Sequence, residues 1–172
     1  MAAMVDLMSL AEQVDREFIL ARRRARLHGF RRRLGGLSGT GTLLSFDKER
    51  RLARAYGGFR RGKSTVEVSR IVGSAGKHDQ FDDEFMPLRR ASPERWKRID
   101  AAFRSGAELP PVSLYGLDGD YFVQDGHHRV SVARFHGTEW MDAEVTEFRS
   151  PGHSEKAAGG ENLTPAEVPP RV

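Results

Sequence analysis

The segment YFVQDGHHRVSVARFHG, residues 121–137, constrains the fold of this chain most strongly. A short apolar run typical of a strand ends at Asp125-Gly126, and a helical pattern follows directly and is closed by Gly137. The apolar residues of this helix cover more than half of its circumference: Val130, Val132, Ala133 and Phe135. We therefore expect a largely buried helix whose polar residues gather in its first turn.

Further patterns place this helix in a domain of mixed helices and strands. Val112–Tyr115 and Tyr121–Gln124 predict paired strands, because Asp118-Gly119 between them is a hairpin turn signal. Ser92-Pro93-Glu94 is a strong helix start, with a capping hydroxyl and a proline at the first position. The other expected elements are helices over 6–33 and 46–56 and strands over 65–71 and 140–148.

This element order predicts an α+β core over residues 64–148 with an appendage at each end. Residues 1–63 are expected to form a basic helical arm, with glycine-rich breaks between its helices. Residues 149–172 contain four prolines, three glycines and no aromatic residue, so we expect a disordered tail. Phe81 and Phe85 are expected to pack in the core.

The net charge of +4 is the difference between two oppositely charged parts. Residues 1–63 contain 15 Lys and Arg against 6 Asp and Glu, a net of +9, whereas residues 64–172 have a net of −5. Such asymmetry indicates an acidic partner for the arm, such as nucleic acid, an anionic membrane or an acidic protein surface. The candidate nucleic-acid-binding residues are the arginines of one short run: Arg22, Arg23, Arg24, Arg26, Arg31, Arg32 and Arg33.

Composition excludes several classes of protein. Cysteine is absent from the 172 residues, which excludes a disulfide framework, a thiol nucleophile and a cysteine metal site. No apolar run approaches the roughly 18 residues of a membrane span. The N-terminus carries acids where a secretory signal needs bases. The expected location is the cytoplasm, or the nucleoid if the protein is bound to DNA.

The first turn of the helix after Gly126 has the residues of an anion site. Backbone N–H groups at a helix start, beside a glycine that allows close approach, bind phosphate. Arg129 is suited to clamp a phosphate in bidentate fashion, and His127 and His128 exchange protons near neutral pH. Asp125 can cap the helix, orient a histidine or help to hold Mg²⁺. A structural interpretation stays open, in which Asp125 only caps the helix and pairs with Arg129.

No metal site is predicted for the histidines. Adjacent helical residues diverge by about 100°, so His127 and His128 do not converge on one ion. The usual helical pair of metal ligands is spaced i, i+4. His28 lies in the arm, where no site is expected, and His136 is expected to interact with the dipole at a helix end.

Residues 66–148 resemble the ParB N-terminal domain, also called the ParB/sulfiredoxin-like fold. The resemblance rests on VEVSRIVGS, on PPVSLYGLDGDYFVQDGHHRVSVARFHG and on the closing strand, and it covers about half of the chain. In that family a charged pair and an arginine open a helix after a glycine and meet nucleotide phosphates. Asp125–Arg129 resembles this motif in a DGHHR version. The resemblance implies a small mixed sheet with packed helices.

The resemblance also implies a set of site residues. The nucleotide- or phosphate-binding set is Gly73, Ser74, Lys77, Gly126, His127, His128 and Arg129. The ligand would be ATP, ADP or CTP with Mg²⁺, and His127, His128 and Asp125 would be catalytic, with one histidine as acid and base or phosphate donor. A kinase-like reaction would need an acid as base, and Glu67, Asp79 and Asp82 are available.

Departures from the family pattern limit these implications. Without cysteine, the sulfinic-acid reduction of sulfiredoxins is excluded. The double arginine of ParB is replaced by His127-His128-Arg129, which puts clamp behaviour with CTP in doubt. The residues after 148 contain no helix-turn-helix pattern, so the DNA-sequence recognition of a chromosome-partition ParB is not expected from them.

Three functions follow from the sequence. The first is nucleotide or phosphate binding at the DGHHR helix start, with phosphoryl transfer or nucleotide hydrolysis. The second is a non-catalytic, partition-related regulatory protein that binds DNA through its arginine-rich arm. The third is a ParB-like nuclease, for which no carboxylate cluster stands out. For the arm, docking on the acidic segment 79–84 or contact within a homodimer is the alternative to nucleic acid, and a membrane partner is not expected.

Overall fold

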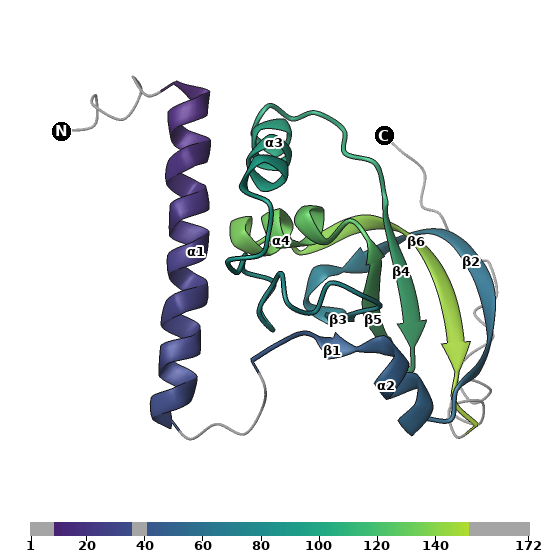
Figure 1. Ribbon diagram of the computed structural model, residues 1–172. Helices are drawn as coiled ribbons and strands as arrows, with labels where there is room; N and C mark the ends of the chain where they lie inside the picture. Colours follow the sequence, from purple (N-terminus) through teal and green to yellow (C-terminus); the bar gives the residue numbers. More distant parts are fainter. Residues whose placement is uncertain (1–8, 36–40, 152–172) are drawn as a thin grey trace, which may run out of the picture.

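The computed structural model describes residues 9–35 and 41–151 and contains a six-stranded mixed sheet covered by helices (Figure 1). The helices are α1 (Leu10–Gly35), α2 (Phe46–Leu52), α3 (Pro93–Arg104) and α4 (His127–His136), with a short 3₁₀ helix, η1 (Val68–Arg70). The strands are β1 (Leu44–Ser45), β2 (Tyr56–Glu67), β3 (Ile71–Ser74), β4 (Val112–Leu117), β5 (Asp120–Asp125) and β6 (Trp140–Arg149). The expected α+β class is confirmed.

The strands lie in the order β1-β3-β5-β4-β6-β2. The pairs β1–β3, β3–β5 and β4–β6 are parallel, whereas β5–β4 and β6–β2 are antiparallel. Both edge strands, β1 and β2, therefore come from the N-terminal part of the chain. The expected boundary between residues 63 and 64 falls inside β2, which pairs with β6 from Tyr56–Arg149 to Glu67–Trp140.

The hairpin of β4 and β5 forms where its turn signal predicts it. Asp118 has a φ of 51° and Gly119 a φ of 96°, and two successive positive values are what a tight hairpin turn requires. The Ser92 hydroxyl likewise caps α3 as predicted, since it accepts a hydrogen bond from the Arg95 amide. Local sequence signals thus place both elements.

Apolar side chains fill both faces of the sheet. One cluster lies between the sheet, α4 and the loop before α3; it includes Leu114, Val123, Val130, Phe81 and Phe85. On the opposite face, α2 inserts Phe46 against Leu117 and Phe122, with Tyr115 and Phe148 partly buried beside them. Successive strand residues point to opposite faces, which is why Leu114 and Tyr115 lie in different clusters.

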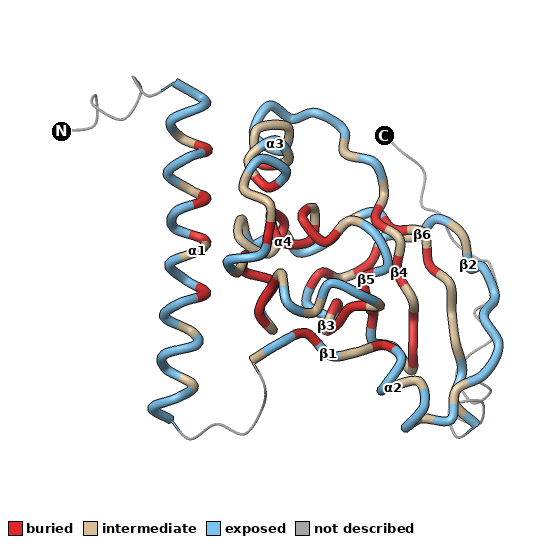
Figure 2. The backbone as a smooth tube through the Cα atoms, in the orientation of Figure 1, coloured by how far each residue is buried: buried red, intermediate tan, exposed pale blue. Residues whose placement is uncertain are grey.

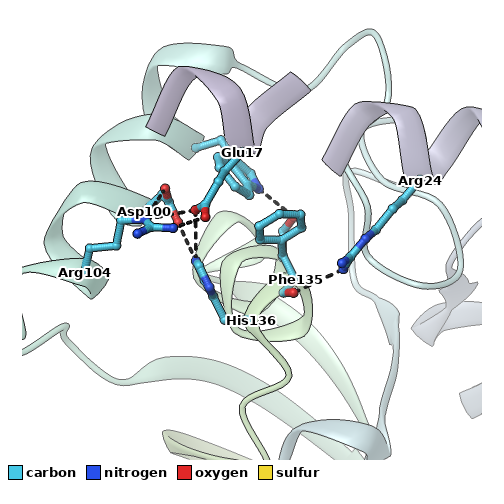
Figure 3. A network of polar contacts seen from close by, with 8 residues as sticks. Glu17, Arg24, Asp100, Arg104, Phe135 and His136 are labelled. Atoms are coloured by element: carbon cyan, nitrogen blue, oxygen red, sulfur yellow. Dashed lines mark hydrogen bonds and ion pairs between the residues drawn. The ribbon is translucent and has the colours of Figure 1, made fainter. Parts of the chain in front are cut away.

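Helix α1 lies across α3 and α4, on the side away from the sheet (Figures 1 and 2). Its buried residues recur every three or four positions and face the domain: Val14, Phe18, Ala21 and Ala25. Phe18, Ala21 and Ala25 pack with the fully buried Trp96 of α3 and with Val132 of α4. Polar contacts reinforce the docking, because the Arg104 guanidinium of α3 donates to the Glu17 carboxylate of α1 at 2.9 Å (Figure 3).

Two expected elements in the first half of the chain have other boundaries in the structure. The helix expected over 46–56 ends at Leu52, and the chain reverses near Arg54, whose φ is 51°. The glycines expected to end this helix lie inside β2, where its register with β6 shifts. The strand expected over 65–71 ends at Glu67, and η1 separates it from β3. A strand partner far along the chain overrides the local signals in this region.

Two expectations about the chain ends lie largely outside the described residues. Of the tail over 149–172, the structure describes only 149–151, and Arg149 still belongs to β6. Residues 6–8 of the expected first helix and residues 36–40 of the glycine-rich joint are likewise not described. Among the described residues, no helix combines the length and the apolar character that crossing a bilayer requires.

Candidate functional site

Helix α4 begins where β5 ends, and Gly126 makes the connection possible. Its φ of 99° lies in the left-handed region, which L side chains rarely adopt. A Cβ atom at this position would also lie 2.6 Å from a methyl group of Val112. Gly126 therefore lets α4 begin immediately after β5, with His127 and His128 in the first turn of the helix.

His127 is a buried, neutral side chain that contacts Ser74. Its Nε2 lies 2.7 Å from the Ser74 Oγ, and the two residues are 3% and 0% exposed. Burial, and next the charge of Lys77, lower the pKa of His127 to about 4. Its Nδ1 is buried and has no hydrogen-bond partner within the described residues. At neutral pH this histidine can accept or donate a hydrogen bond, but it carries no positive charge.

His128 is also neutral, and its environment differs. Burial, followed by the charges of Lys77 and Arg95, lowers its pKa to about 4. The Phe81 ring lies edge-on to His128, with centroids 5.2 Å apart, and is stacked with His127 at 6.2 Å. Both histidines thus contact one buried aromatic ring, at different angles.

Arg129 is held by hydrogen bonds to neighbouring groups of the protein. Its guanidinium donates to the carbonyl oxygen of Pro110, to that of Pro111 at 2.7 Å and to the Asp125 Oδ2 at 2.8 Å. The Arg129 side chain is 13% exposed, whereas that of Asp125 is 70% exposed. These contacts fasten α4 to the segment before β4, which agrees with the structural interpretation of this pair.

Lys77 and His127 line one cavity of about 420 Å³, here called the Lys77 pocket. The other lining residues are Phe46, Asp47, Arg50, Ala75, Gly76, Tyr115, Gln124 and Phe148. Arg129 lines a different hollow, beside Pro110 and Phe103. The structure therefore brings Lys77 and His127 together and does not bring Arg129 to them. Of the predicted site residues, the larger hollows of about 530 and 580 Å³ contain only the candidate base Glu67, which lines the second of them.

The Lys77 pocket has an aromatic wall and a second cation that the sequence did not indicate. The Phe46 ring centroid lies 4.6 Å from that of Tyr115 and 5.0 Å from that of Phe148. The Arg50 guanidinium carbon is 5.8 Å from the Phe46 and Phe148 centroids. Both Arg50 and Asp47 belong to α2, and only the fold shows that α2 lies beside Lys77.

The other residues predicted for the site take part in packing or in turns, or lie away from the Lys77 pocket. Gly73 is buried in β3, where a Cβ atom would collide with the carbonyl oxygen of Leu44 and with the Phe122 ring. The Ser74 hydroxyl accepts from the Gly76 amide at 3.0 Å and so shapes the turn that presents Lys77. The candidate bases Glu67, Asp79 and Asp82 are absent from the lining of the Lys77 pocket, and Asp47 is the carboxylate that lines it.

The seven predicted arginines of α1 comprise three with a side-chain contact and four that form no ion pair with the described residues. The Arg22 guanidinium carbon lies 5.8 Å from the Phe18 ring centroid. Arg24 donates to the Phe135 carbonyl at 3.2 Å, and Arg32 forms an ion pair with Asp83 of the acidic segment. Four others are exposed and form no ion pair with any described residue: Arg23, Arg26, Arg31 and Arg33. Helix α1 is thus docked through its apolar face, while part of its basic surface remains open to solvent.

One comparison with known proteins finds a similar structure. The crystal structure of sulfiredoxin from Arabidopsis thaliana matches 56% of this chain and 92% of its own, with a TM-score of 0.38 and 14% identical residues. No family model matches the chain, and no curated protein sequence matches it. The resemblance to the ParB N-terminal domain and the DGHHR version of its motif both stay predictions.

Proposed function

We propose that this protein binds a nucleotide through its phosphates in the Lys77 pocket. The observation that carries the proposal is the meeting of two cations, Lys77 and Arg50, with an aromatic wall in one cavity of about 420 Å³. Nucleotides combine polyanionic phosphates with a flat base. The two cations of the pocket match the phosphates, and its aromatic wall matches the base.

The lining residues suggest how the ligand is held. Lys77 and Arg50 neutralise the phosphates, and the rings of Tyr115 and Phe148 offer an apolar surface to the base. Asp47 is an oxygen ligand for the Mg²⁺ that accompanies nucleotide phosphates. Gln124 adds a donor and an acceptor. ATP, ADP and CTP with Mg²⁺ are therefore the ligands to compare.

The neutral state of His127 defines its part in this proposal. With a pKa of about 4, it does not add a third positive charge to the site at pH 7. It instead holds Ser74, whose hydroxyl organises the turn before Lys77. If the protein also hydrolyses or transfers a phosphoryl group, Asp47 is the carboxylate of the pocket that is available as acid or base. A phosphate-release assay with each nucleotide tests turnover separately from binding.

Isothermal titration with each nucleotide and Mg²⁺ tests the binding proposal. We expect dissociation constants below about 1 mM and a loss of about tenfold or more for Lys77→Ala and for Arg50→Ala. Lys48→Ala is the matched control, because Lys48 is exposed on the same helix as Arg50 and does not line the pocket. Absence of sub-millimolar binding, or equal binding by all three variants, would refute the proposal.

A second candidate function rests on the open arginines of α1. Arg23, Arg26, Arg31 and Arg33 are exposed on a docked helix, which suits sequence-independent contact with DNA phosphates. Changing all four to Gln is expected to weaken binding of a labelled duplex and to flatten its dependence on salt concentration. If the quadruple variant binds DNA as the parent does, α1 is not a nucleic-acid surface.

A further inference from the structure

Helix α1 and the acidic segment bring together three side chains that can ligate a metal ion. The His28 Nδ1 lies 3.2 Å from the Asp83 Oδ1 and 3.8 Å from the Asp82 Oδ2. One ligand atom from each residue lies within 4.8 Å of the other two. His28 comes from α1, whereas the carboxylates come from the loop between β3 and α3, so the three groups meet only because α1 is docked.

The carboxylate oxygens that face His28 are buried and lack hydrogen bonds. Asp82 is 3% exposed, and its Oδ1 accepts from the amides of Met86 and Glu84 at 2.7 and 3.1 Å. Its Oδ2 has no hydrogen-bond partner among the described residues, nor does the Asp83 Oδ1.

The groups around the three side chains match the outer shell of a metal site. The His28 Nε2, the ring nitrogen that faces away from Asp82, lies 3.6 Å from the Glu84 Oε1. Histidine ligands of metals regularly donate their second ring N–H to a carboxylate. The Glu84 carboxylate lies beside this nitrogen, just beyond hydrogen-bond distance. Arg32 pairs with the Oδ2 of Asp83 and leaves the Oδ1 directed at His28.

A second triad that includes a residue of α1 differs from this one in its surroundings. Glu17, Asp100 and His136 also lie within ligating distance of one another, but Arg104 is inserted among them (Figure 3). The Arg104 Nε donates to Glu17 at 2.9 Å and lies 3.5 Å from the Asp100 Oδ2. The Asp100 Oδ1 is 2.6 Å from the His136 Nε2. In this triad Arg104 lies beside the one Asp100 oxygen that lacks a hydrogen bond. In the triad of His28, Arg32 pairs only with the outer Oδ2 of Asp83, and the two carboxylate oxygens that face His28 have no hydrogen-bond partner among the described residues.

We propose that His28, Asp82 and Asp83 bind one divalent transition-metal ion, with Zn²⁺ as the best fit, and that this ion fastens α1 to the acidic segment. Imidazole nitrogen with carboxylate oxygen is a common ligand set for Zn²⁺. Tetrahedral bonds of about 2.1 Å separate neighbouring ligand atoms by about 3.4 Å, and the two measured separations from His28 are 3.2 and 3.8 Å. A fourth position is left for water, because His28 and Asp83 retain 22% and 30% side-chain exposure.

Titration of the full, tag-free chain with Zn²⁺ after treatment with a chelator tests this site. We expect one ion per chain with a dissociation constant below about 10 µM, and weakening of about tenfold or more in both His28→Gln and Asp83→Asn. Glu17→Gln is the control from the second triad and should bind Zn²⁺ as the parent does. Circular dichroism tests whether each variant is folded. If His28→Gln is not folded, Asp83→Asn decides the outcome.

Two further readouts separate this site from binding elsewhere on the chain. Zn²⁺ should raise the melting temperature of the parent and of Glu17→Gln, and it should leave that of Asp83→Asn unchanged. Co²⁺ in place of Zn²⁺ should give the visible absorption of a four-coordinate site in the parent and in Glu17→Gln, but not in Asp83→Asn. Binding weaker than about 10 µM, or binding that both His28→Gln and Asp83→Asn retain, would show that His28 only pairs with the two acids, and the proposal would be wrong.

Discussion

At the residue scale, the start of α4 depends on a glycine for two separable reasons. Gly126 has a positive φ, and it also lacks the Cβ atom that would collide with Val112. Gly137, at the other end of the same helix, has a φ of 70°, but a Cβ atom added there would meet open space out to 4 Å. Gly137 therefore reports the cost of backbone strain alone, whereas Gly126 adds steric contact with Val112.

We expect Gly126→Ala to destabilise the protein more than Gly137→Ala. The second substitution costs about 1 kcal/mol for the left-handed backbone alone. The first adds the displacement of Val112, so that its total reaches about 2–4 kcal/mol. Urea denaturation of both variants measures the difference. Equal losses would mean that Val112 moves aside without cost.

We expect the buried histidines to make the free energy of unfolding fall in acid. Their pKa is about 4 in the folded protein and about 6.5 in an unfolded chain. The unfolded state therefore binds more protons between these values, and the stabilisation, complete above about pH 6.5, is lost as the pH falls toward 4. Asp82 and Asp100, whose pKa burial raises, act in the opposite direction, so only a comparison of variants isolates the histidines.

We expect His128→Gln to cost more stability at pH 7 than at pH 4, by up to about 3 kcal/mol. The variant lacks the group whose protonation destabilises the parent, so the two proteins should converge in acid. Urea denaturation of both at the two pH values gives the four free energies needed. A cost that is the same at both pH values would mean that His128 is not held neutral by burial.

At the element scale, α1 is attached through a narrow apolar stripe. Ala21 is fully buried against α3 and α4, and Trp96 beneath it is fully buried as well. Ile19, two residues away on the same helix, is 66% exposed. One helix thus offers a buried and an exposed position for the same substitution, and Trp96 reports which of them disturbs the docking.

We expect Ala21→Asp to release α1, because an unpaired carboxylate cannot remain in the apolar interface. Trp140, which is 56% exposed, is first changed to Phe so that Trp96 alone fluoresces. The Ala21→Asp protein should then show red-shifted emission and greater quenching by acrylamide. Ile19→Asp in the same background should resemble the parent. An unshifted spectrum for Ala21→Asp would mean that α1 does not cover Trp96 in solution.

At the scale of the whole molecule, the sheet joins segments from both ends of the described chain. Strand β2 forms the outer partner of β6, and β1 forms that of β3. A chain that starts at Gly41 keeps both strands and loses only α1 and the segments that flank it. A chain that starts at Ser64 loses β1 and most of β2, which leaves β6 with an unpaired edge.

We therefore expect the fragment 41–172 to be monodisperse and folded, and the fragment 64–172 to aggregate or to unfold at much lower urea. Size-exclusion chromatography and circular dichroism of the two fragments measure this. A well-behaved 64–172 fragment would mean that the sheet is complete without its N-terminal edge strands.

Local signals were sufficient for part of this fold. Gly126, Asp118-Gly119 and Ser92-Pro93 each act on their immediate neighbours, so the start of α4, the hairpin and α3 could be predicted from the sequence. The long strand β2 could not be predicted, because its glycines indicate a break. Its stabilising partner is β6, which is distant in the sequence: Tyr56, for example, pairs with Arg149.

The candidate site shows the same division. The residue types at the start of α4 indicated an anion site, and Lys77 and His127 do line one pocket. The orientation of Arg129 depends on two carbonyl oxygens before β4, which no spacing near residue 129 reveals. Arg50 and His28 reach their neighbours only through the docking of α2 and α1, so no motif around either residue identifies them.

The position of β6 also determines when this sheet can be completed. A ribosome makes β2 early and β6 last among the described strands, yet β6 lies between β4 and β2. Throughout the synthesis of the intervening residues, β2 has no strand beside it and exposes its backbone hydrogen-bonding groups to other chains. Completion of the sheet must wait for residues 140–149 to leave the ribosome, so the speed of translation sets how long each nascent chain remains open to misassembly.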